Sequence, residues 1–83
     1  MSEPSGDVRI MLEQIAKALV DAPDNVFVEA FEEDGETVLE LEVDPNDMGK
    51  VIGRHGRTAK ALRTLLSAAS MRLNKRYVLE ILE

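Results

Sequence analysis

The chain has 83 residues, 45% of them hydrophobic, which is enough for one small domain and leaves no room for a second. It contains no cysteine, so disulfides, thiolate nucleophiles and thiolate metal ligands are excluded. The net charge of −6 argues against a phosphate-rich partner unless the basic residues are gathered in one place.

The basic residues are in fact gathered in one segment. Eight Lys or Arg residues and no acid lie between Gly49 and Arg76. The rest of the chain holds the other two basic residues and all sixteen acids, so its charge is −14 against +8 for the segment. Because salt screens charges beyond about 8 Å, a bound strand would mostly feel the nearby basic residues. The pattern indicates a nucleic-acid partner; the alternative is an ordinary surface with one basic face.

The N-terminal residues carry neither a positive cluster nor an apolar run, which argues against a secretory signal. No apolar stretch approaches the roughly 20 residues that span a bilayer. We therefore expect a cytoplasmic protein.

Residues 1–6 are expected to form a flexible tail and residues 7–83 the domain. Asp7 can cap a first helix, which Ala22-Pro23 ends. Apolar residues recur in this helix at spacings of three and four, as on a buried helix face.

Two strands are predicted next, at about 26–33 and 36–43, joined by the two-residue hairpin turn Asp34-Gly35. A turn at residues 44–47 then leads into a short helix at about 47–52, which Gly53 ends. This acidic turn lacks the ligand spacing of a calcium site, so no metal is expected.

A long helix is predicted from about Arg57 to Leu73, followed by a third strand from Tyr77 to Leu82. The helix exposes a ridge formed by Arg57, Lys60 and Arg63 on one side. Its predicted buried stripe consists of Leu62, Leu65, Leu66, Ala69 and Leu73.

The order helix, strand, strand, helix, helix, strand predicts an α+β fold, with a three-stranded sheet and all helices packed on one face. The other sheet face is then uncovered. By alternation along the strands it carries Phe27, Phe31, Val38, Val78 and Leu82 among Glu29, Glu40 and Glu42. Two interpretations stay open: scattered exposed apolar residues, or a partner or dimer surface.

The segment Val51-Ile52-Gly53-Arg54-His55-Gly56-Arg57 is the strongest functional signal. Glycine permits positive φ and a close approach of a ligand backbone. We expect the main-chain amides of residues 53–57 to point outward at the start of the long helix, where they can bind phosphate groups. The alternative is a plain corner between two helices with a glycine cap.

Three further residues admit two interpretations each. Lys60 and Arg63 are either solvated helix charges or phosphate ligands. His55 is the only histidine, and as an exposed loop residue it could contact a phosphate or a base.

No nucleophile–base pair is visible, and the motif lacks the Gly-Lys-Ser/Thr ending of a P-loop. No enzymatic activity and no cofactor are therefore expected.

The run from Val51 to Arg63 closely resembles the signature of the K-homology (KH) domain, whose GXXG loop clamps about four nucleotides of single-stranded RNA. A hairpin ahead of the motif resembles the bacterial type II arrangement. With Asp-Pro-Asn-Asp-Met-Gly before it, the chain from about residue 8 to 82 is similar to the small single-KH bacterial proteins of the KhpA type.

That resemblance implies a cytoplasmic RNA-binding factor and RNA chaperone that affects cell-wall homeostasis, cell shape and division. It implies a homodimer, or a heterodimer with a larger KH-containing protein of the KhpB type. Ala59 departs from the broader pattern, in which a larger aliphatic residue is usual, and this could make the groove shallower. The loop role falls on Gly53, Arg54, His55 and Gly56, and the groove role on Val51 and Ile52.

The full set of expected RNA-binding residues adds neighbouring cations. It consists of Lys50, Val51, Ile52, Gly53, Arg54, His55, Gly56, Arg57, Lys60 and Arg63. The competing function is a protein–protein adapter that acts through the open sheet face or the long helix. A double change of Gly53→Asp and His55→Asp is expected to abolish RNA binding and leave the fold intact.

Overall fold

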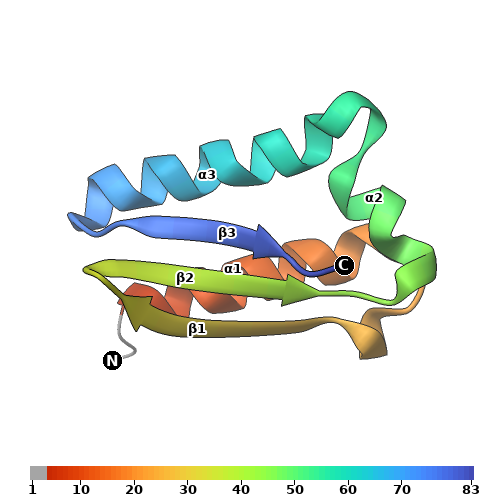
Figure 1. Cartoon of the computed structure of the whole chain (residues 1–83), viewed down its shortest axis with the longest axis horizontal. Helices are drawn as coiled ribbons and strands as arrows, with labels where there is room; N and C mark the ends of the chain where they lie inside the picture. Colours follow the sequence, from red (N-terminus) through yellow and green to blue (C-terminus); the bar gives the residue numbers. More distant parts are fainter. Residues whose placement is uncertain (1–3) are drawn as a thin grey trace.

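The structure is a computed structural model that describes residues 4–83 (Figure 1). Its helices are α1 (Pro4–Leu19), α2 (Met48–Ile52) and α3 (Arg57–Leu73), and its strands are β1 (Phe27–Glu33), β2 (Glu36–Glu42) and β3 (Tyr77–Ile81). Three short 3₁₀ turns connect them, η1 (Pro23–Asn25), η2 (Pro45–Asp47) and η3 (Arg54–Gly56).

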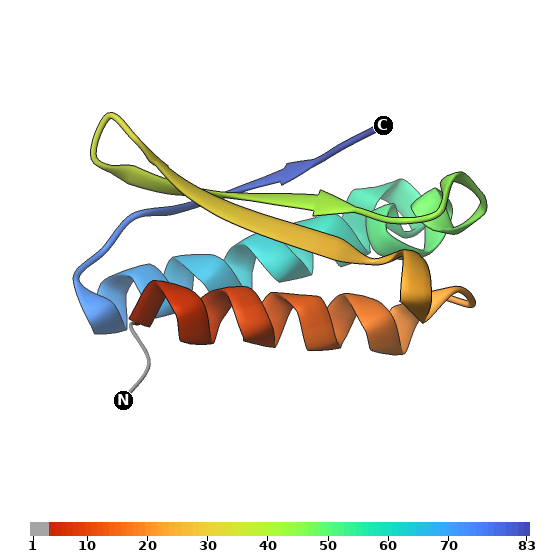
Figure 2. The ribbon, with the colours of Figure 1, turned by 90° about the horizontal axis from the view of Figure 1, so that it is seen from below.

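The elements form two layers, with the sheet on one side and the helices on the other (Figure 2). The strand order is β1-β2-β3; β1 pairs antiparallel with β2, and β2 pairs parallel with β3. The parallel pair arises because α2 and α3 form the crossover between β2 and β3. The predicted α+β architecture and its element order are confirmed.

The hairpin follows from its two turn residues. Asp34 and Gly35 both take positive φ, 52° and 81°, as the tight turn between antiparallel strands requires. This turn sets the register Glu33↔Glu36. As a result, Leu39 and Leu41 face the helices and are fully buried.

Helix α1 begins earlier than the sequence predicts. It starts at Pro4, and Asp7 lies within its first turn instead of capping it. Proline suits the first turn of a helix because its φ is already helical and its missing N–H would have no helical acceptor. Residues 4–6, assigned above to a flexible tail, are therefore helical, whereas residues 1–3 lie outside the described residues.

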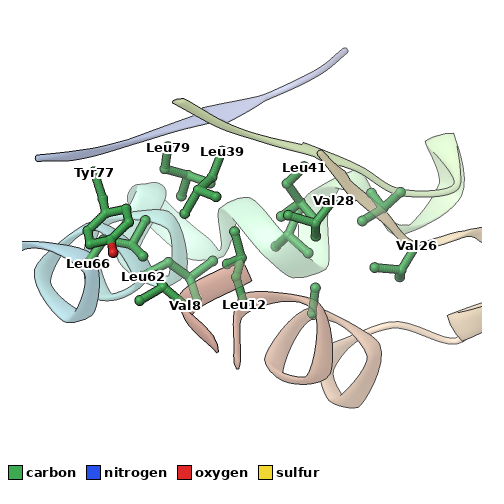
Figure 3. Packing of buried hydrophobic residues seen from close by; sticks show 13 residues of the cluster. Val8, Leu12, Val26, Val28, Leu39, Leu41, Leu62, Leu66, Tyr77 and Leu79 are labelled. Carbon is green, nitrogen blue, oxygen red and sulfur yellow. The ribbon is translucent and has the colours of Figure 1, made fainter. Parts of the chain in front are cut away.

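The core lies between the layers (Figure 3). Leu12 of α1 and Leu66 of α3 meet the inward residues of the sheet there, and both are almost completely buried. Leu65 was predicted to be buried but is 47% exposed. It falls at the margin of the stripe formed by Leu62, Leu66 and Ala69, which faces the core.

Within residues 4–83, no helix covers the other face of the sheet (Figure 2). Phe27 is 55% exposed there, and Phe31 and Leu82 are also exposed. Val38, predicted for this open face, is nevertheless buried, because it pairs with Phe31 on one side and with Val78 on the other.

Candidate nucleic-acid interface

The turn between α2 and α3 is built on two glycines. Gly53 ends α2 with φ 79° and ψ 169°, and its N–H donates to the carbonyl of Gly49 at 2.8 Å. Gly56 then takes φ 73° and begins α3. The turn lies at one end of the molecule, beyond the C-terminal end of β3 (Figure 1).

The two glycines are required for different reasons. A Cβ on Gly53 would overlap Thr58 and lie 2.7 Å from its backbone nitrogen, so the start of α3 packs directly against this glycine. A Cβ on Gly56 would meet nothing within 4 Å. The surface beside Gly56 is thus open to a ligand, while the surface beside Gly53 is filled by the protein itself.

Arg54 and His55 form the exposed tip of the turn. His55 takes the left-handed conformation, φ 58° and ψ 25°. This conformation reverses the chain between the two glycines and leaves both side chains exposed to solvent.

The expectation about the main-chain amides was wrong for three of the five residues. Gly53, Gly56 and Arg57 donate their N–H groups to the carbonyls of Gly49, Gly53 and Arg54. The reason is the tight 3₁₀ turn, which satisfies its own donors. Within the part of the chain that the structure describes, Arg54 and His55 have no internal acceptor for their N–H groups.

The predicted ridge on α3 is present. Arg57, Lys60 and Arg63 are all exposed and follow the turn along the helix. Together with Arg54 they form a cationic track that starts at the loop and continues along α3. None of the four takes part in a salt bridge between described residues.

Lys50 differs from the four cations of the track because it is paired within the chain. Its Nζ lies 3.2 Å from Asp21 Oδ2 and 3.6 Å from Asp47 Oδ1. The hydrogen bond with Asp21, followed by the charges of both acids, raises the pKa of Lys50. Lys50 was predicted to bind RNA; in this structure its ammonium group pairs with Asp21 and Asp47.

Val51 and Ile52 differ in their burial. Val51 is completely buried, so its side chain supports α2 from beneath, and its predicted role in a surface groove is corrected. The five-residue helix shows too little periodicity to reveal its inward face. Ile52 is half-buried and keeps some surface beside the turn.

Ala59 is buried at 4% exposure, where a larger residue would push α3 away from its neighbours.

A hollow of about 200 Å³ lies between α3 and β3. It is lined by Arg63, Leu66, Tyr77, Val78 and Leu79. Arg63 belongs to the cationic track, so the track borders this hollow.

Asp47 supports the site from beneath α2, and this contact was not predicted from the sequence. Its carboxylate is 3% exposed and accepts the N–H groups of Ala22 at 3.0 Å and of Asp21 at 3.3 Å. Burial alone would raise the pKa of Asp47, but these two hydrogen bonds and Lys50 together lower it. The partners lie 25 and 26 residues away, so no local pattern could have revealed the contact.

Residues 4–83 offer neither a metal-binding cluster nor a membrane-spanning helix. No group of three or more His, Cys, Asp or Glu side chains is placed to hold a metal ion. No helix there is long and apolar enough to cross a membrane.

The sequence model of the KhpA/KhpB KH domain matches residues 9–81. The chain belongs to this family. It is 54% identical to the RNA-binding protein KhpA of Clostridium acetobutylicum over 72 residues, which cover 87% of this chain and 96% of that protein. The RNA-binding protein KhpA of Aquifex aeolicus is 52% identical over 88% of this chain and 92% of its own length.

The relationship extends over the full length in a third case. The RNA-binding protein KhpA of Borreliella burgdorferi is 45% identical over all 83 residues, with both chains covered completely. The KhpA/KhpB family is a KH-domain family and not an enzyme family, which confirms the expectation of no enzymatic activity. The type II arrangement expected from the early hairpin agrees with the element order of the structure.

Proposed function

We propose that the protein binds single-stranded RNA without catalysing a reaction and holds the sugar-phosphate backbone at residues 53–57. One observation carries the proposal: Arg54 and His55 project from the turn with amide N–H groups that have no internal acceptor among the described residues. Backbone donors and an arginine at the start of a 17-residue helix form a suitable site for a phosphate.

The cationic track defines a path for the RNA strand over the surface of the protein. From the turn, the backbone passes Arg57 and Lys60, while bases turn toward Ile52 and the hollow beside Arg63. With about three phosphate contacts on a single strand, the logarithm of the affinity falls with the logarithm of the salt concentration with a slope of about −2. One domain of this kind binds weakly.

Pairing of two domains would raise the avidity by effective concentration. We propose a homodimer, or a heterodimer with a larger KhpB-type protein; the exposed Leu65 on α3 supports a partner surface there. The family relationship supports a cytoplasmic RNA chaperone that affects cell-wall homeostasis, cell shape and division. These physiological roles are part of the proposal.

The test is RNA binding by a variant with Arg54→Asp and His55→Asp, measured by fluorescence anisotropy with a labelled single-stranded RNA. Both glycines are retained, because the clash of a Gly53 side chain with Thr58 shows that Gly53→Asp would disturb the fold, contrary to the expectation above. Aspartate tolerates the left-handed conformation of His55, as Asp34 already does in this chain.

The matched control combines Ser67→Glu with Arg72→Glu. These exposed residues lie farther along α3, and the two changes alter the net charge as much as the loop variant does. We expect the loop variant to lose binding by more than about tenfold, because it replaces a charge-assisted contact with repulsion, and the control to lose much less. Equal losses would mean that net charge alone, and not the loop, attracts RNA.

A further inference from the structure

The open face of the sheet carries its charges in an unusual row. Glu29, Glu40 and Glu80 lie directly opposite one another on β1, β2 and β3. Glu42 lies on the same face, opposite Phe27. Like charges that face each other across strands destabilise a sheet. The requirements of folding therefore do not account for the row.

None of these carboxylates has a cationic partner among residues 4–83. Between described residues, no salt bridge involves Glu29, Glu40, Glu42 or Glu80, whereas Glu13 is paired with Arg9 and Glu36 with Arg76. Among the described residues, the four carboxylates of this group are therefore without an ion-pair partner, as are other exposed acids such as Asp24.

Apolar residues border the carboxylates and form a hollow with them. A cavity of about 170 Å³ is lined by Phe27, Glu29, Glu40, Glu42 and Leu82. Phe27 and Leu82 are both exposed, so the hollow has apolar walls and three carboxylates around it. The aliphatic stem of an arginine or lysine packs well on such walls, and its charged head reaches the carboxylates.

We propose that the open sheet face binds a basic segment of a protein partner that also carries apolar residues, with an arginine or lysine in the hollow between Phe27 and Leu82. RNA and anionic membranes are repelled by the glutamates. A second copy of the chain docked through the same face would bring the two glutamate rows together. A cationic polypeptide complements both the charge and the apolar border.

This surface is separate from the one proposed for RNA. The sheet face looks away from the helices, and the turn between α2 and α3 lies at the end of the helical layer (Figures 1 and 2). The inference therefore goes beyond RNA binding, and both surfaces can be occupied at once.

The experiment is an amide NMR titration of the full chain with a short synthetic peptide that alternates arginine and leucine. A peptide with glutamate in place of arginine serves as the negative probe. We expect the arginine peptide to shift the amides around Phe27, Glu40 and Leu82 and to leave those of Arg54 and His55 unmoved. No shift at the sheet face, or equal shifts with the glutamate peptide, would overturn the proposal.

Two variants that each remove one negative charge distinguish binding at the sheet face from general attraction of the basic peptide to an acidic protein. Glu40→Gln removes the central carboxylate of the row, and Asp24→Asn removes an exposed acid of η1 outside it. We expect Glu40→Gln to lower the affinity for the arginine peptide about tenfold, as for a lost charge-assisted hydrogen bond. The same change should raise the melting temperature of the free protein, because it removes repulsion between the glutamates. Equal weakening by both variants would overturn the proposal.

Phe27→Ser tests whether RNA or a second copy of the chain occupies the sheet face instead of a basic peptide. With the arginine peptide we expect loss of binding, and with single-stranded RNA no change. Loss of RNA binding, or a change in the oligomeric state measured by sedimentation, would assign the face to RNA or to a second copy and overturn the proposal.

Discussion

Gly53 and Gly56 flank the same turn, but the backbone uses them differently. Gly53 has φ 79° and ψ 169°, a combination open essentially to glycine alone, and it packs against Thr58. Gly56 has the ordinary left-handed conformation and open space beside it. One glycine thus serves the fold, and the other leaves room for a ligand.

This difference predicts a large loss of stability from substitution of Gly53 and a small one from substitution of Gly56. Gly53→Ala should lower the free energy of unfolding by at least about 2 kcal/mol, from backbone strain and the clash with Thr58. Gly56→Asn should lower it by no more than about 1 kcal/mol, because asparagine tolerates this conformation, yet it should weaken RNA binding. Urea unfolding together with anisotropy measures both. A stable Gly53→Ala protein would contradict the assigned packing.

Tyr77 gives a second prediction at this scale. Its hydroxyl is buried in the core without a hydrogen-bond partner in the part of the chain that the structure describes (Figure 3). A buried polar group without a partner is destabilising, so Tyr77→Phe should raise the free energy of unfolding by about 1 kcal/mol. Denaturant unfolding measures the change. A loss of stability instead would show that the hydroxyl has a partner in solution.

Individual residues show where sequence reasoning stops. The exposure of His55 was predicted from its place in a loop, and Arg54 beside it is exposed as well. The amides of Gly56 and Arg57 were predicted to be available but are not, because hydrogen bonds inside a turn depend on its exact dihedral angles. Val51 was misplaced because one and a half helical turns do not define a face.

At the scale of elements, α2 depends on contacts from elsewhere. Five residues are too few for a stable isolated helix. Asp47, just before α2, accepts hydrogen bonds from the backbone that follows α1, and Lys50 of α2 pairs with Asp21 in the same segment. These contacts hold α2, and with it the turn, against the end of α1.

This anchor predicts a pH dependence. The pKa of Asp47 in the folded protein lies below its ordinary value of about 3.9, so its stabilising effect is complete above that pH and is lost as the pH falls toward the folded pKa. Wild type should therefore melt higher than Asp47→Asn at neutral pH, with the difference shrinking below about pH 4.

The measurement is a series of melting curves of both proteins from neutral to acid pH. The comparison is needed because Glu13, whose pKa is lowered chiefly by its hydrogen bond from Arg9, loses its effect in a similar acid range in both proteins. A melting difference that stays constant down to low pH would contradict the anchor.

Most elements could be predicted from local patterns. Alternation along β2, the Asp34-Gly35 turn and the apolar spacing of α1 and α3 each report a local requirement, so they set the element order. The start of α1 and the exposure of Leu65 were missed. The start of α1 is a local effect, because a proline suits the first turn of a helix, whereas the exposure of Leu65 depends on which elements pack beside α3.

At the scale of the whole molecule, the charges are sorted by surface. The cations of the acid-free segment extend from the turn along α3, and glutamates occupy the open sheet face. The acids slow the approach of nucleic acid from other directions. A bound strand at the turn is shielded from distant acids by salt, so an acidic protein can still bind RNA there.

The central claim is that the main chain of Arg54 and His55 grips a phosphate. The most direct measurement is an amide NMR titration of the full chain with a short single-stranded RNA. The account predicts that the amide signals of Arg54 and His55 move most, that those along α3 move less, and that the sheet face around Glu40 does not move. Signals at the turn that stay fixed while others shift on binding would contradict it.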